Sequence, residues 1–392
     1  MKPIRTVFRI WYDELTDLFR DKGILIFILF VPLAYPLLYS WVYTNEVVRE
    51  VPAAVVDDSR TPQSRAFIRM VDATPDVAVA AHCTTVAEAE ELLRRREVFG
   101  IIRIPESFTK DIRRGDQTFV GVYSDMSSML YYKALLLAAT KVSLEMNADI
   151  KVGRHLPGTT DRQDEIQHTP IEYDYVALYN PQSGFAAFLI PPVLMLILQQ
   201  TLLLGVGMSA GRMRERFRGS LVPFHRDYKN PVCIVLGKAA AYFGIYIVMV
   251  LYAFTIVTHG FSLPLGDLAT LTAFVVPFLL ACIFLAMVLS SLVWRREDCI
   301  LLFVCLSVPL LFISGVSWPW PSVPAFWKGV ACLFPSTFGM NGYVRIQSTG
   351  ATLSDVAFEL RGLWIQTGVY FLLACLIYRR QIRLIADRHY RA

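Results

Sequence analysis

Long apolar runs alternate with densely charged stretches along this chain of 392 residues. A helix that crosses the hydrocarbon core of a bilayer needs about 20 mostly apolar residues. Six runs meet or approach that length, so the pattern predicts an α-helical polytopic membrane protein with six transmembrane helices. The predicted spans lie at 24–44, near 185–208, at 239–259, at 269–293, at about 299–316 and at 358–378, the last with its apolar part at 362–378.

The segment before the first span, residues 1–23, has apolar side chains at helical spacing. We expect an amphipathic cytoplasmic helix that lies on the membrane surface. It contains four acids, and no A-x-A-like cleavage site follows it, so an uncleaved anchor is a better interpretation than a signal peptide. The predicted apolar face consists of Ile4, Val7, Phe8, Trp11, Leu15, Leu18 and Phe19.

Residues 45–183 form a domain-sized insertion in which strand and helix patterns alternate. Repeated β-α units of this kind favour an inserted mixed α/β domain with a largely parallel sheet. Only Cys83 falls in this insertion, so it holds no internal disulfide. Residues 151–175 are polar and predict a loop or linker. The predicted strands are 53–56, 77–81, 99–104 and 119–123, and the predicted helices are 64–71, 86–96, a short one ending at 113, and 127–150.

Composition and charge extend this picture. The chain is 55% hydrophobic and 18% charged, against about 25% charged in soluble domains, which excludes an ordinary soluble enzyme. Residues 209–238 hold seven Lys and Arg against two acids, whereas residues 45–183 hold 16 against 21. The positive-inside rule therefore places both termini in the cytoplasm and residues 45–183 outside.

Catalytic, cofactor and metal motifs are absent from the sequence. No P-loop motif and no Cys/His metal spacing occurs, so we expect no catalytic, cofactor-binding or metal residues. Gly205 to Gly211 has the wrong spacing for a dinucleotide fingerprint, and close helix packing explains it better. The first five predicted spans carry no charge, which leaves the energy source to a partner. Gln199 and Gln200 indicate either interhelical hydrogen bonds or a subunit seam or path.

Two further segments have unusual patterns. Residues 209–221 combine arginines, one glutamate and apolar side chains, which indicates either a stop-transfer loop or a docking segment. Prolines and tryptophans interleave after the fifth span, and this predicts a re-entrant outer helix hairpin at 317–345. The residues that define this hairpin are Gly315, Trp318, Pro319, Trp320, Pro321, Pro324 and Pro335.

The order of these parts resembles the permease subunit of type-2 ABC exporters, in the subgroup with a large extracytoplasmic domain between the first and second spans. Residues 215–221, ERFRGSL, are similar to the family's Glu-Arg-Glu-x-Gly-Thr-Leu signature. Residues 314–335 are similar to the outer hairpin of the family. Residues 54–57 and 100–105 are similar to the strands of those members that carry this insertion. Phe217 replaces the second glutamate of the signature, and Val222 replaces a later one.

The resemblance implies two permeases, identical or different, above two separate P-loop ATPase subunits that hold the ATP and magnesium. It implies that residues 209–232 form a coupling loop, with Glu215 and Arg216 contacting the ATPase and Phe217 and Leu221 as apolar anchors. It places the protein in the inner membrane of a bacterium, and it allows a periplasmic adaptor; no nucleic-acid partner is expected. The expected coupling residues are Arg212, Arg214, Glu215, Arg216, Phe217, Gly219 and Leu221.

The expected function is export of an amphipathic, lipid-like or drug-like substrate, with ATP hydrolysed on another subunit. The alternative is a non-transporting scaffold or receptor whose outer domain binds envelope or secretion partners. An intramembrane enzyme is disfavoured because the chain lacks clustered polar catalytic residues.

Overall fold

The computed structural model describes residues 2–44, 47–153, 179–180, 184–217, 219–223, 228–261 and 266–391. Most of the predicted linker at 151–175, and positions 218 and 224–227 of the predicted coupling loop, lie outside the described residues. The chain divides into two compact units, each described by itself below. One combines Met1–Glu46 with Ala177–Ala392, and the other is Val47–Val176.

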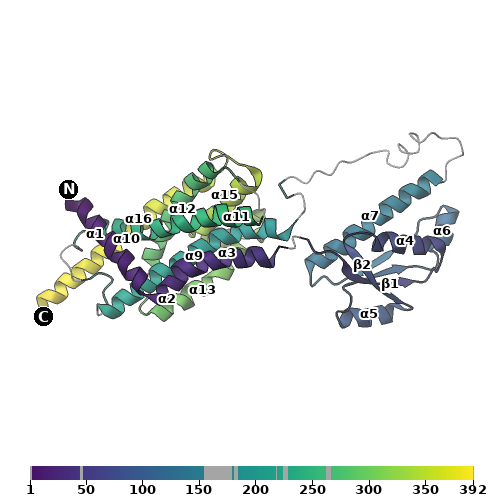
Figure 1. Ribbon diagram of the computed structural model, residues 1–392, viewed down its shortest axis with the longest axis horizontal. Helices are drawn as coiled ribbons and strands as arrows, with labels where there is room; N and C mark the ends of the chain where they lie inside the picture. Colours follow the sequence, from purple (N-terminus) through teal and green to yellow (C-terminus); the bar gives the residue numbers. More distant parts are fainter. Residues whose placement is uncertain are drawn as a thin grey trace. The chain divides into compact units, whose positions relative to one another are not determined.

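The first unit is a helical bundle in which both chain termini lie at the same end (Figure 1). Its long helices follow the apolar runs of the sequence. The elements are α1 (Lys2–Arg20), α2 (Lys22–Leu25), the π-helical turn η1 (Ile26–Phe30), α3 (Val31–Val42), α9 (Phe185–Arg216), α10 (Pro231–Leu251), the π-helical turn η2 (Tyr252–Val257), α11 (Thr258–Gly260), α12 (Leu268–Leu289), α13 (Arg296–Ile313), the 3₁₀ turn η3 (Trp320–Ser322), α14 (Ala325–Ala331), α15 (Pro335–Thr349) and α16 (Ala357–Arg391).

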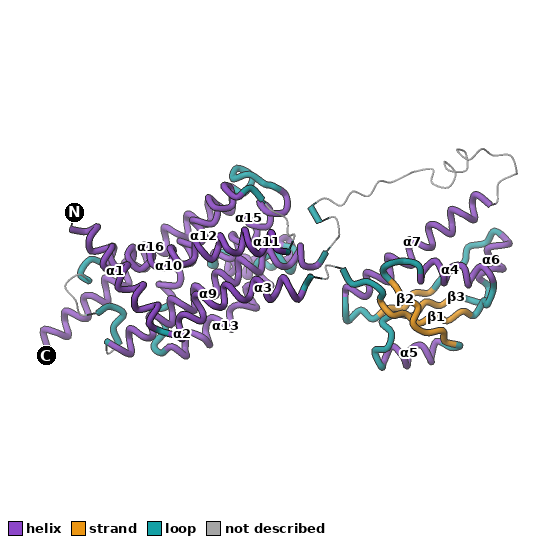
Figure 2. Tube along the Cα trace, viewed as in Figure 1, coloured by secondary structure: helices purple, strands orange, loops and turns teal. Residues whose placement is uncertain are grey.

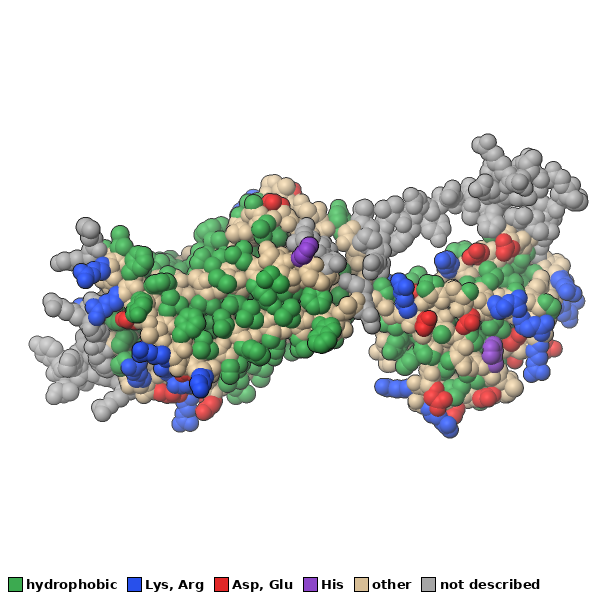
Figure 3. Space-filling model, in the orientation of Figure 1, with side chains coloured by type: hydrophobic (Ala, Val, Ile, Leu, Met, Phe, Trp, Pro, Cys, Tyr) green, Lys and Arg blue, Asp and Glu red, His purple; other side chains and the backbone are tan. Residues whose placement is uncertain are grey.

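Within the described residues, five continuous helices are long and apolar enough to cross a membrane. The chain is therefore a multi-pass membrane protein, and Figure 3 shows a broad belt of hydrophobic side chains over this unit. The fifth predicted span, at about 299–316, coincides with α13, which is not among these five helices and whose first turn carries Arg296, Glu297 and Asp298. A sixth crossing therefore stays a prediction. The five helices are Lys22–Val42, Phe185–Arg216, Pro231–Gly260, Leu268–Leu289 and Ala357–Leu384.

Small residues bring α9 against its neighbours. A Cβ atom at Gly205 would lie 2.2 Å from Ile28, and one at Gly207 would lie 2.3 Å from the Sγ atom of Cys299. A side chain at either position would have to displace these buried neighbours, so glycine permits the close approach of the helices. The prediction that these glycines serve helix packing is confirmed.

Two of the long helices contain a π-helical turn, η1 and η2. The π-helical turn η2 contacts α3. There the Tyr252 hydroxyl donates a hydrogen bond of 3.0 Å to the Leu33 carbonyl. A π-helical turn places one additional residue in a helix without breaking it. The first and third spans therefore meet where the helical repeat is locally altered.

The second unit is a mixed α/β domain built on a four-stranded sheet of order β2-β1-β3-β4 (Figure 2). β1 pairs parallel with β2 and β3, and β4 is antiparallel to β3. The apolar side chains of α4 and α7 cover one face of the sheet, and those of α5 cover the other. The elements are β1 (Val51–Asp57), α4 (Pro62–Asp72), β2 (Val77–Cys83), α5 (Val86–Arg94), β3 (Gly100–Ile104), α6 (Phe108–Arg114), β4 (Gly121–Ser124) and α7 (Met129–Gly153).

Candidate functional site

Helix α9 does not end at the predicted inner boundary of the second span. It continues to Arg216, so residues 209–216 of the predicted coupling loop are helical. This stretch has no proline, and five of its eight residues are Ala, Arg or Met, which are good helix formers. The helix ends at Phe217, close to Gly219, whose φ of +91° suits glycine. The predicted docking segment is thus a rigid extension of a span.

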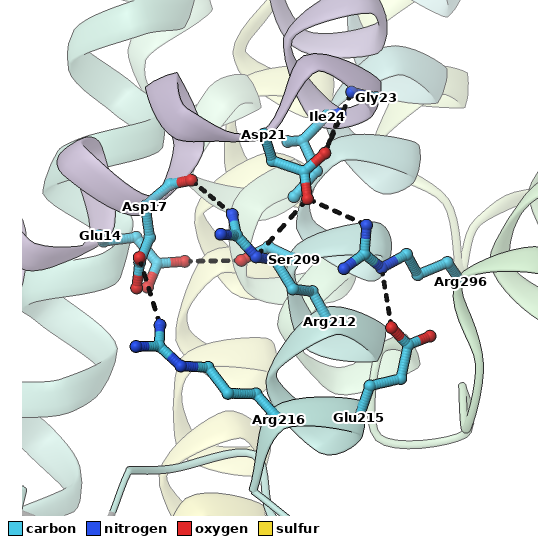
Figure 4. Close-up of polar contacts among 10 residues, drawn as sticks. All are labelled: Glu14, Asp17, Asp21, Gly23, Ile24, Ser209, Arg212, Glu215, Arg216 and Arg296. Atoms are coloured by element: carbon cyan, nitrogen blue, oxygen red, sulfur yellow. Dashed lines mark hydrogen bonds and ion pairs between the residues drawn. The ribbon is translucent and has the colours of Figure 1, made fainter.

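The charged side chains of this extension contact other parts of the same unit (Figure 4). Arg212 donates to the Asp17 carbonyl at 2.7 Å. Arg216 lies 3.6 Å from the Asp17 carboxylate. Glu215 accepts a hydrogen bond of 3.0 Å from Arg296, at the start of α13. The structure therefore brings three of the predicted coupling residues together, and it joins them to α1 and α13.

Asp21 lies at the centre of these contacts. Its carboxylate caps α2 by accepting from the Gly23 amide at 3.0 Å, and it also accepts from Arg296 at 2.9 Å. Arg212 lies 3.5 Å from the same carboxylate. The Asp21 side chain is 11% exposed, so these ion pairs are less screened by water than surface pairs. We call Asp17, Asp21, Arg212, Glu215, Arg216 and Arg296 the Asp21 network.

Two other predicted coupling residues lie inside the bundle. Arg214 is buried, donates to the Ser291 carbonyl at 2.6 Å and stacks over the Trp294 ring at 4.8 Å. Leu221 is 1% exposed and belongs to the hydrophobic core. Phe217 is half-buried, with the Arg216 guanidinium 5.4 Å from its ring centre. In this structure Arg214 and Leu221 hold the segment in place, and Glu215 and Arg216 are the exposed side chains among its described residues.

A buried ion pair that the sequence interpretation missed joins α1 to α10. Glu14 accepts from Lys238 at 2.7 Å, from the Tyr242 hydroxyl at 2.8 Å and from the Ser209 hydroxyl at 3.0 Å. The Glu14 and Lys238 side chains are only 2% and 5% exposed. Burial raises the pKa of Glu14, but the Lys238 charge and the three hydrogen bonds outweigh it and hold that pKa below its ordinary value.

The ion pair changes the interpretation of α1 and of the third span. α10 begins at Pro231, so Lys238 lies within a span that the sequence interpretation treated as free of charge. The face of α1 that packs on the bundle carries Ile10, Glu14 and Leu18, whereas Ile4 and Phe8 are exposed. The four-residue spacing of Glu14 from Ile10 and Leu18 is the signal that could have found this site.

The segment predicted as an outer hairpin folds into a turn followed by two helices, α14 and α15. Gly315 has a φ of +89°, and its Cα lies against the Trp320 side chain. Pro335 is buried in the first turn of α15, where its missing N–H costs nothing. Whether this segment re-enters the bilayer stays a prediction. The exposed members of the predicted set are Trp318, Pro319, Pro321 and Pro324.

The two glutamines of α9 differ in their contacts. Gln199 is fully buried; it accepts from the Ser336 amide at 2.7 Å and donates to the Ser336 hydroxyl at 3.0 Å. Gln200 is also buried, but neither polar atom of its side chain has a hydrogen-bond partner in the described part of the chain. Gln199 therefore makes the interhelical contact, here with α15, and the role of Gln200 as a seam or path stays a prediction.

The described residues contain no assembled metal site, and their cysteines are all free. No group of three or more His, Cys, Asp or Glu side chains there is placed to hold a metal ion.

Comparison with known proteins agrees with this arrangement. Residues 22–376 match the family described as "ABC-2 family transporter protein". The chain is also 22% identical over 359 residues to a protein of Dictyostelium discoideum, "ABC transporter G family member 20". That similarity covers 89% of this chain and 46% of the relative, so the chain spans about half the relative's length. The chain thus belongs to the ABC-2 transporter family and is a membrane-spanning permease component of an ABC transporter.

Proposed function

We propose that this permease exports an amphipathic, lipid-like or drug-like substrate across the cytoplasmic membrane of a bacterium. ATP and magnesium are bound and consumed on separate P-loop subunits, and a second permease completes the membrane body. Both termini lie in the cytoplasm and residues 45–183 lie outside, as the distribution of Lys and Arg favours. The chain supplies the path and the coupling surface.

The Asp21 network is the observation that carries the proposal. It links the α1–α2 junction, the end of α9 and the start of α13 through charged hydrogen bonds of about 3 Å. The Glu215 and Arg216 side chains are 46% and 59% exposed, so they are accessible to a partner surface. An ATPase that moves these two side chains therefore moves three helices together.

A charge-reversal variant of the full chain, Glu215→Arg with Arg216→Glu, tests this assignment. We expect it to lose co-purification with the ATPase and ATP-driven export, because like charges then face each other across the interface. Asp17→Asn is the matched control, since it removes the intramolecular partner of Arg216 and leaves the exposed charges in place. Normal ATPase association and export in the charge-reversed chain would show the assignment to be wrong.

The same purification decides between the exporter and the scaffold. Unaltered chain extracted from its native membrane should bring an ATPase with it, and substrate should stimulate the ATP hydrolysis of the complex. Recovery of the chain with envelope or secretion proteins and without any ATPase would favour the scaffold.

A further inference from the structure

A cavity of about 480 Å³ lies between the start of α9, the turn after α13, α15 and the start of α16. This volume is within the range of about 300–1,000 Å³ typical of small-molecule sites. The cavity lies away from the Asp21 network, and neither the family match nor the coupling residues explain it.

The cavity walls are aromatic. Phe188, Trp320, Phe338 and Phe358 come from four separate segments, and the Phe338 and Phe358 rings meet edge to face at 6.0 Å. Phe188 and Phe358 are 51% and 72% exposed, so one side of the cavity is open to the surroundings of the bundle. Such walls bind the apolar body of a ligand through its buried area.

Two oxygen acceptors line the same cavity. Asn341 donates from its side-chain nitrogen to the carbonyls of Ser314 at 2.9 Å and Thr337 at 2.7 Å. Because carbonyls only accept, these bonds fix the orientation of the amide and leave Oδ1 as an acceptor. No residue that the structure describes donates to Asn341 Oδ1.

Glu359 supplies the second acceptor. The residue is 8% exposed, its Oε1 accepts from Arg345 at 3.0 Å, and its buried Oε2 has no hydrogen-bond partner in the described ranges. Arg345 also donates to the Asp355 carbonyl at 2.8 Å. An unpaired buried acceptor of this kind is destabilising, and a bound donor would recover that loss.

The chemistry of these groups selects the head group of the ligand. The ion pair of Arg345 and Glu359 is neutral as a whole, so a charged head group would be desolvated without compensation. A carboxylate would meet these two acceptors, and the one cation in the lining, Arg345, is already paired with Glu359 and the Asp355 carbonyl. A quaternary ammonium brings no donor. A hydroxyl supplies a donor without adding charge.

We propose that this cavity binds a neutral amphiphile, with an apolar body against the aromatic walls and a hydroxyl head whose single O–H donates to one of the two acceptors, Asn341 Oδ1 or Glu359 Oε2. The inference names the substrate class of the exporter and in that respect rests on the proposed function. Binding itself requires only the permease.

Photolabelling of the full chain in lipid nanodiscs tests the inference. The probes are undecyl chains that carry a diazirine and end in a hydroxyl, a carboxylate or a trimethylammonium group. We expect the alcohol to label Phe188, Trp320 and Phe338 preferentially, and excess 1-dodecanol to suppress the labelling. Equal labelling by all three probes would overturn the proposal, since it would indicate an ordinary lipid-exposed surface.

Variants locate the site. Val344→Phe fills the cavity without removing a hydrogen bond. Asn341→Leu removes one acceptor together with the two hydrogen bonds that its amide donates, and it should weaken labelling by about fivefold. Val304→Phe, at an exposed position of α13, is the matched control and should label normally. The melting temperature of each variant is measured alongside, and unchanged labelling of a folded Val344→Phe chain would refute the site.

The charge-reversed coupling variant separates the two proposals. It should keep alcohol labelling and lose export if both are correct. If the unaltered chain exports normally but shows no preference for the alcohol probe, the proposed binding site is wrong and the proposed export function is unaffected.

Discussion

Removal of the Glu14 carboxylate should destabilise the helical unit far more than loss of an exposed charge. Glu14→Gln leaves the Lys238 ammonium buried, with its 2.7 Å partner replaced by a neutral amide. Breaking a buried ion pair on one side typically costs about 3–5 kcal/mol, because the remaining charge is uncompensated. Tyr242 and Ser209 also lose a charged acceptor, which adds to this cost.

A double-mutant cycle separates the pair from its surroundings. Lys238→Met should cost a similar amount, whereas Glu14→Gln with Lys238→Met should cost much less than the sum of the single changes, since no buried charge is left. The free energy of unfolding is measured in detergent micelles by denaturant titration followed by tryptophan fluorescence. Glu91→Gln, in an exposed pair with Arg95 of the α/β unit, is the control and should be silent.

The reasoning fails if Glu14→Gln is as silent as Glu91→Gln, or if the double variant costs the full sum. Either result would mean that water or a neutral Glu14 satisfies the site and that the ion pair does not hold α1 on α10. A positive result would show that α1 is a fixed part of the bundle.

Three more predictions follow from the described contacts. The pKa of Glu14 in the folded chain is lowered from 4.5, so the stabilisation that its carboxylate provides is complete above pH 4.5 and is lost as the pH falls through the folded-state pKa. The difference in unfolding free energy between the unaltered chain and Glu14→Gln should therefore shrink in acid. A difference that stays constant down to the folded-state pKa would contradict the ion pair. Gly315→Ala should lower stability by about 1–2 kcal/mol in thermal unfolding, because alanine is strained at a φ of +89° and its Cβ would lie 2.9 Å from Trp320; an unchanged melting temperature would contradict this. In a cysteine-free background, an impermeant maleimide applied to intact cells should label Arg65→Cys and not Arg379→Cys, and the reverse result would invert the proposed topology.

The sequence predicted those elements whose pattern is local. The four strands of the α/β unit were found within a few residues, because β-branched runs such as that at β1 are bounded by turn residues and helix caps. Five apolar runs predicted helices long enough to cross a membrane, for the same reason. These signals depend only on neighbours along the chain.

The site depended on contacts between distant segments. The apolar run of the third span begins after Lys238, so sequence alone assigns this charge to the preceding loop. Only the packing of α1 shows that Lys238 is buried with Glu14. Arg212 and Arg214 lie two residues apart and carry the same charge. Arg212 joins the Asp21 network, whereas Arg214 is buried beside Trp294. Which arginine joins the network is decided by tertiary packing, and residue type alone cannot distinguish them.

The π-helical turn in the third span has a consequence for how substitutions there should be read. One additional residue rotates the helix by about 100°, so positions before Tyr252 and after Val257 belong to two different phases of the same helix. Phe254, within the turn, stacks on Tyr343 of α15 at 4.6 Å. A scan of tolerated substitutions along residues 231–260 would therefore show two periodic patterns that are offset by one residue, and the boundary between them would mark where the third span changes its packing partners.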